Sequence, residues 1–121
     1  MLFSISQNSL SLKSGQISSY IITVTINKND EKNIPTYFLV KLTSSNPDNL
    51  YPISVYTNKT EYEYTTKNLI PKGASDAFQF KIFGKLPSGA TSATYKITAK
   101  LFYNNTALEN KELVLNVNLH E

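Results

Sequence analysis

Hydrophobic and polar residues alternate with a period of two along most of this chain. The clearest example is TYKITAKLFYNNTALENKELVLNV (94–117), which reads as two strands around a polar tip. Apolar side chains recur at every second position of both arms, as in strands with one buried face. We predict a hairpin with its turn over Asn104–Asn110 and with Ile97 facing Val117. A slip of one residue would expose the apolar rows, so the pattern specifies which face is buried.

The same period predicts further strands in the rest of the chain. They are a first strand split near Gln7–Ser9 within 3–13, and strands over 17–27, 36–43, 50–57, 61–65 and 78–82. Gly and Pro turns separate them, and no segment has the period of a helix. Short strands at this spacing predict an all-β fold, an immunoglobulin-like β-sandwich of about seven to eight antiparallel strands. Pro52 places its strand at a sheet edge.

Composition narrows the class of protein. A chain of 121 residues with 40% hydrophobic residues fits one globular domain over residues 1–121. The net charge is +3, and all twelve basic residues are lysines scattered among nine acids. Arginine supplies most bidentate contacts to guanine and phosphate, so its absence weighs against nucleic-acid binding. We therefore expect no nucleic-acid partner.

Residues that carry chemistry are scarce. The chain has no cysteine, which removes thiolate catalysis and zinc–sulfur sites. Its one histidine, His120, is second from the C-terminus, where we expect a frayed and solvated residue. The four glycines read as isolated turn glycines, so no phosphate-binding loop is present. We expect a protein that is not an enzyme and that uses no cofactor and no metal.

A family resemblance rests on the order of several segments: YIITVTIN, FLVKL, IPKGASDAFQFKI, LPSGATSATYKITAKLFYNN and ELVLNV. This order resembles the immunoglobulin-like and fibronectin-like surface modules called CARDB and NEW3. In those modules a Pro-Gly and Tyr element opens the penultimate strand, and LPSGATSATY is longer than the usual turn. The resemblance implies a structural role for Tyr95, as a tyrosine corner whose hydroxyl folds back onto upstream backbone. In size and fold, the chain also resembles the soluble domain of archaellum stator proteins of the FlaF and FlaG type.

The sequence leaves two cellular locations open. The start, MLFSISQNSLSLKSG, lacks the basic and apolar regions of a signal peptide. Either the protein is not exported, or the chain follows a removed N-terminal membrane anchor and lies outside the cytoplasm, in the cell envelope. Two sequons, at Asn58 and Asn104, mark possible glycosylation sites, which would require export.

We expect a non-catalytic structural or interaction module at a cell surface. The resemblance implies that it anchors or stabilises a filament or envelope assembly, as an archaellum stator does, through contacts with a protein of that assembly. One alternative is a carbohydrate-binding module that uses Tyr56, Tyr62 and Tyr64. A second alternative is an unexported viral or cytoplasmic structural protein.

A surface patch gives the interaction hypothesis its residues. Phe102 and Val114 point outward from the hairpin, and Tyr37 and Leu39 point outward from the strand expected beside it. A contiguous exposed apolar patch often marks an interface. We therefore predict that these four residues mediate docking to a partner or self-association, most simply as a two-fold dimer.

Overall fold

The computed structural model describes residues 2–28, 37–67, 69–103 and 105–121, and every helix or strand in these ranges is a β-strand. In chain order the strands are β1 (Leu2–Ile5), β2 (Ser9–Lys13), β3 (Gln16–Ile17), β4 (Ile22–Asn27), β5 (Leu39–Ser44), β6 (Leu50–Ser54), β7 (Glu63–Thr65), β8 (Ser75–Gly84), β9 (Ser92–Tyr103) and β10 (Thr106–His120). No helix in the described ranges is long and apolar enough to span a bilayer.

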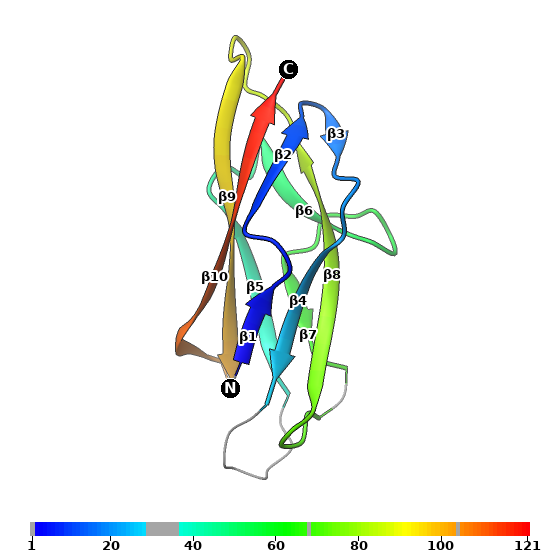
Figure 1. Ribbon diagram of the computed structural model, residues 1–121, viewed down its shortest axis with the longest axis vertical. Helices are drawn as coiled ribbons and strands as arrows, with labels where there is room; N and C mark the ends of the chain where they lie inside the picture. Colours follow the sequence, from blue (N-terminus) through cyan, green and yellow to red (C-terminus); the bar gives the residue numbers. More distant parts are fainter. Residues whose placement is uncertain (1, 29–36, 68, 104) are drawn as a thin grey trace.

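The strands form two sheets that pack face to face (Figure 1). Sheet A has the order β1-β4-β8-β3, with β6 also paired to β8, and sheet B has the order β2-β10-β9-β5-β7. The predicted immunoglobulin-like sandwich is confirmed. The described part contains ten strands rather than seven or eight, because two predicted strands are each divided into shorter pieces.

The first strand is split, as predicted, and its two halves join different sheets. β1 pairs antiparallel with β4, whereas β2 pairs with β10 in parallel. The chain changes sheets between Ile5 and Ser9, so the apolar residues of both halves reach the same core. Because of this crossing, the sandwich is not wholly antiparallel, contrary to the prediction.

The predicted continuous strand over 17–27 is interrupted at residues 18–21. Ser18 is buried, and its hydroxyl accepts a hydrogen bond from the Ile82 N–H (3.0 Å) and donates one to the Tyr20 carbonyl (3.1 Å). A side chain that bonds backbone groups in this way competes with the ladder. The interruption leaves Tyr20 and Ile21 exposed, although Tyr20 continues the alternation of the buried Ile22, Val24 and Ile26.

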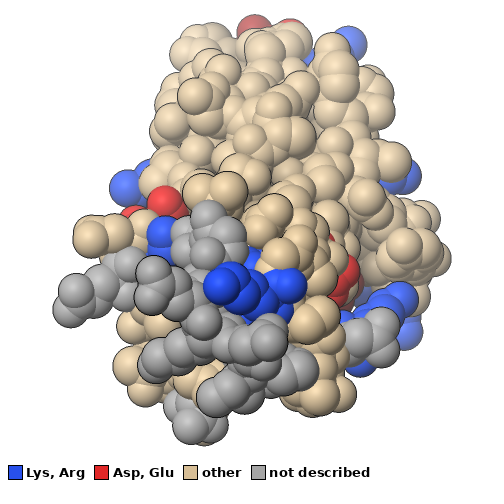
Figure 2. Space-filling model, turned by 60° about the horizontal axis from the view of Figure 1, so that its bottom comes forward, with Lys and Arg blue, Asp and Glu red and all other residues tan. Residues whose placement is uncertain are grey.

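The core lies between the sheets and consists of the inward rows that the period predicted. Fully enclosed side chains come from both sheets: Ile22, Val24, Ile26, Leu50 and Ile82 from sheet A, and Val40, Leu101, Leu115 and Val117 from sheet B. Burial of this apolar surface is the main force that holds the two sheets together. Charged side chains are sparse on the end shown in Figure 2, where lysines lie at several separate places among uncharged residues.

The hairpin of β9 and β10 forms, but its predicted register is wrong by two residues. Ile97 faces Leu115, and Val117 faces Tyr95. Pairing resumes already at Thr106, so the loop is shorter than the predicted turn. A bulge then follows, in which β10 carries residues 108–111 where β9 carries one residue. The even shift leaves every side chain on its predicted face.

The C-terminal end is not frayed, which corrects the expectation for His120. This residue pairs with Lys13 of β2 and Ser92 of β9, and its carbonyl accepts a hydrogen bond from the Ser14 N–H (2.8 Å). The side chain is exposed, and its Nδ1 lies 2.9 Å from the Glu121 carbonyl oxygen. The last residues of β10 are therefore part of sheet B.

Candidate binding surfaces

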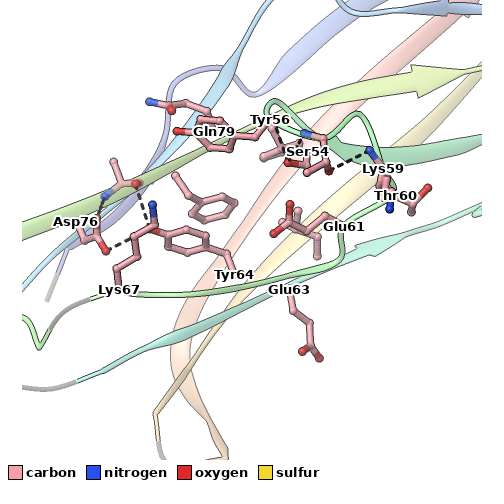
Figure 3. A pocket seen from close by; sticks show the side chains of 15 residues that line it. Ser54, Tyr56, Lys59, Thr60, Glu61, Glu63, Tyr64, Lys67, Asp76 and Gln79 are labelled. Carbon is pink, nitrogen blue, oxygen red and sulfur yellow. Dashed lines mark hydrogen bonds between the residues drawn. The ribbon is translucent and has the colours of Figure 1, made fainter.

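A pocket of about 550 Å³ opens at one edge of the sandwich, beside β8 and β7 (Figure 3). We call it the edge pocket. Its lining consists of Leu42, Ser54, Tyr56, Thr57, Lys59, Thr60, Glu61, Glu63, Tyr64, Lys67, Asp76, Ala77, Phe78, Gln79 and Phe80. Leu42, Phe78 and Phe80 are buried core residues and form an apolar floor, while most of the polar side chains are exposed at the rim. This size and this arrangement are typical of ligand sites.

The pocket exists because β6 ends at Ser54 and leaves part of β8 uncovered. The Ser54 hydroxyl accepts hydrogen bonds from the N–H groups of Tyr56 (3.2 Å) and Thr57 (3.4 Å), which turns the chain away from β8. Asn58, in this turn, has φ of 56°, a left-handed conformation that asparagine tolerates. Because Pro52 lies in β6, which pairs only with β8 among the named strands, the predicted edge strand is confirmed.

Tyr64 links the two sheets across the pocket. Its ring stacks on Phe78 with centroids 4.4 Å apart, and its hydroxyl donates towards Asp76 Oδ2 (3.3 Å) and the Ala77 carbonyl (3.4 Å). Burial raises the pKa of Tyr64 to about 12, and the neighbouring Asp76 carboxylate adds to this shift. The hydroxyl is therefore a stable hydrogen-bond donor at neutral pH.

The rim carries charges of both signs. Lys59 and Lys67 are interspersed with Glu61, Glu63 and Asp76. Within the described ranges, no three His, Cys, Asp or Glu side chains gather in a way that could hold a metal ion. His120 lies away from this pocket, at the end of β10.

A second surface lies on the outer face of sheet A, and sequence reasoning missed it. Ile17 of β3 is paired with Phe83 of β8, and Phe83 is paired with Tyr51 of β6. The rings of Tyr51 and Phe83 stack at 5.2 Å, and Ile17 is 46% exposed. We call these three residues the outer row. In the sequence, the apolar run Tyr20–Ile22 breaks the alternation. This was the feature that could have revealed an interruption after the short β3.

Three of the four predicted interface residues lie on sheet B or just before it. Leu39 of β5 is paired with Phe102 of β9, and the exposed Tyr37 precedes Leu39 by two residues. We call these three residues the β5–β9 cluster. Leu39 and Phe102 are half-buried, and the Lys41 ammonium lies 4.8 Å from the centre of the Phe102 ring. This lysine makes a cation–π contact with the ring.

The structure separates Val114 from this cluster. Val114 is paired with Thr98, four residues along β9 from Phe102, which corresponds to about 13 Å at the usual rise per residue. Between them lies the pair of Lys100 and Glu112, whose charged atoms are 3.8 Å apart. The four residues therefore do not form one contiguous patch.

The remaining predicted residues fall at separate places. Tyr95 is half-buried against the core in β9, and no hydrogen bond of its hydroxyl is found within the described ranges, so the tyrosine corner stays a prediction. Asn58 is exposed in the turn after β6, and Asn104 lies outside the described residues. Of the three tyrosines proposed for carbohydrate binding, Tyr56 and Tyr64 line the edge pocket and Tyr62 does not.

Comparison with known proteins identifies the fold. No family model and no curated protein matches the sequence. Among solved structures, the periplasmic chaperone SfaE superposes with a TM-score of 0.54 at 9% identity over 98% of this chain. This chain spans 57% of the chaperone's length.

A PapD-like domain of human CEP192 superposes with a TM-score of 0.51 at 11% identity, over 98% of this chain and 84% of that domain. At such low identity, these similarities show the fold alone. Function has to be argued from the binding surfaces. The fold of this chain is thus an immunoglobulin-like β-sandwich, similar to that of these two proteins.

Proposed function

We propose that this chain is a non-catalytic protein-interaction module, a single domain that associates with a second copy of itself through the outer row. The observation that carries the proposal is the line of Ile17, Phe83 and Tyr51, one apolar and two aromatic residues paired side by side across three strands. Aromatic side chains in such a position are enriched at protein interfaces. A two-fold axis along this row would place each of the three side chains against its counterpart in the second copy, so the surface can be self-complementary.

Sedimentation velocity from micromolar to millimolar concentration tests the proposal. We expect the wild type to associate as its concentration rises and Ile17→Lys to remain monomeric, because a lysine in the contact would have to be desolvated. Leu39→Lys, in the β5–β9 cluster, is the matched control on the other sheet. A wild type that is monomeric throughout the range, or an Ile17→Lys variant that associates normally, would contradict the proposal.

The β5–β9 cluster remains the second candidate interface. The sequence pattern predicted Tyr37 and Leu39 as interface residues, and the same sedimentation experiment tests this prediction. If Leu39→Lys abolishes association while Ile17→Lys does not, the contact lies on sheet B. Val114→Lys should then have no effect, because Val114 lies beyond the Lys100–Glu112 pair.

The finer proposal places this module in a cell envelope, where it anchors or stabilises a filament or lattice, in the narrowest form as an archaellum stator domain. The fold it shares with a periplasmic protein supports an extracytoplasmic location. Mass spectrometry of the protein isolated from its native cells tests this location, because the exposed Asn58 is open to glycosylation. A glycan at Asn58 would support export, and recovery of the protein in the cytosolic fraction alone would contradict it.

A further inference from the structure

One half of β8 has a strand neighbour on one side only. On the first side, β4 pairs with Ser75–Phe80 and β3 with the last two residues of β8. On the second side, β6 pairs only from Phe80 onward. The second edge of β8 is therefore unpaired from Ser75 to Gln79, and this open edge borders the edge pocket.

Alternation along the strand shows which backbone groups face the pocket. The Ile82 N–H and carbonyl both bond Ser18, so they point to the side of β3 and β4. The Lys85 N–H donates to the Asn49 carbonyl, on the side of β6. Successive residues of a strand direct their hydrogen-bonding groups to opposite edges. The backbone groups of Ala77 and Gln79 consequently point to the open edge.

Side chains already form hydrogen bonds with some of the backbone groups on this edge. The Ala77 N–H donates to Asp76 Oδ1 (2.8 Å), which occupies it fully. Among the described residues, the Ala77 carbonyl receives one bond, the long one from Tyr64, whose hydroxyl is shared with Asp76 (Figure 3). No partner of the Gln79 N–H is found in the described part of the chain. One acceptor and one donor, on either side of Phe78, are thus available.

We propose that the edge pocket binds an extended segment of a partner polypeptide, which runs parallel to β8 and places one apolar side chain opposite Phe78. The residue at that position would donate its N–H to the Ala77 carbonyl and accept from the Gln79 N–H, the pattern of a parallel ladder. Its side chain would face the same way as Phe78, onto the apolar floor of the pocket. Addition of a strand to an open sheet edge is an established mode of peptide recognition, in which the backbone supplies affinity and such a pocket supplies specificity.

This site is separate from the outer row and goes beyond the proposed self-association. The backbone donor and acceptor at ladder spacing favour a peptide over a saccharide. A saccharide would stack on the exposed Tyr56 ring and bond the rim side chains, without need of the Gln79 N–H. The two kinds of ligand therefore depend on different groups of the pocket.

The probe is the peptide acetyl-Ser-Thr-Val-Thr-Ser-amide, titrated to millimolar concentration into isotope-labelled protein while backbone amide shifts are recorded. We expect a saturable shift of the Gln79 amide. The same peptide with N-methylvaline at its centre lacks the N–H for Ala77, and a central aspartate would have to enter the apolar floor, so neither should bind. These two peptides test the geometry without any change to the protein.

Protein variants test the same contacts from the other side. Gln79→Pro removes the donor without removing a bond to β4, because that N–H points away from β4, and it should abolish binding. Gln79→Ala keeps the N–H and should bind normally. Tyr64→Phe frees the Ala77 carbonyl and should tighten binding roughly 2- to 10-fold, the usual effect of one hydrogen bond. Ile17→Lys should bind as the wild type does, which separates this site from the outer row.

Three results would overturn the proposal. The first is the absence of any Gln79 shift at millimolar peptide. The second is equal binding of the parent and N-methylated peptides. The third is a saturable shift with chitohexaose, lost in Tyr56→Ala, in place of one with the peptide, which would assign the pocket to saccharides.

Discussion

The Leu115 side chain of β10 is fully buried in the core. It faces Ile97 across the hairpin and has no exposed surface. We expect Leu115→Ala to lower the free energy of unfolding by about 2–5 kcal/mol, through lost burial and the cavity left behind. Urea denaturation followed by circular dichroism measures this loss. Asn116→Ala, at the next and exposed position, serves as the control, and a loss below about 0.5 kcal/mol for Leu115→Ala would place the wrong face inward.

Tyr64 gives the protein a predictable response to high pH. Its pKa is raised from 10.0 to about 12, so the folded state favours the protonated hydroxyl. The stability that this hydroxyl contributes is therefore complete below about pH 10 and is lost as the pH rises towards 12. NMR of tyrosine labelled at the ring carbon that bears the hydroxyl should show Tyr64 titrating last or nearly so. A Tyr64 resonance that titrates near pH 10 would contradict the burial of this hydroxyl and its contact with Asp76, and Tyr64→Phe assigns the signal.

The glycines show how far residue type alone predicts a structural role. Gly15, Gly73 and Gly89 have φ between 82° and 84°, as turn glycines do, in agreement with the sequence reading. Gly84 lies instead in β8, buried where the sheets meet, and a Cβ there would lie 2.5 Å from Leu119 Cδ2. Close approach between strands distant in the sequence leaves no local pattern, so this role could not be predicted.

At the scale of elements, alternation located the strands and their inward faces, because burial of one face imposes a period of two. It could not locate the bulge in β10, which sets the register of the hairpin. That bulge contains Asn110 with φ of 57°, a conformation that asparagine can adopt but does not require. The interruption after β3 escaped prediction for a similar reason, since it depends on a bond between Ser18 and the distant Ile82.

Removal of the last residues of β10 should destabilise the protein. Deletion of His120 and Glu121 removes the acceptor of the Ser14 N–H and the last pairs with β2 and β9. We expect a loss of about 1–3 kcal/mol, the sum of a few backbone hydrogen bonds. Thermal unfolding of this deletion, beside a deletion of Glu121 alone, measures it. Identical melting temperatures for the two truncated proteins and the full chain would mean that the end is frayed after all.

At the scale of the whole molecule, both proposed binding surfaces depend on which strands become neighbours. The outer row joins β3, β6 and β8, and the edge pocket depends on where β6 leaves β8. Neither arrangement is visible in the sequence, because both arise from pairing between segments far apart in the chain. The β5–β9 cluster was accessible to prediction because the topology of an immunoglobulin-like sandwich puts its two strands side by side.

We propose that this sandwich acts through association at the outer face of sheet A. A dilution series of amide NMR spectra of the wild-type protein tests it most directly, because it reports which residues change environment as copies meet. We predict concentration-dependent shifts at Ile17, Tyr51 and Phe83, with the amides of Leu39 and Phe102 unchanged. Spectra that do not change with concentration, or changes confined to sheet B, would contradict the claim.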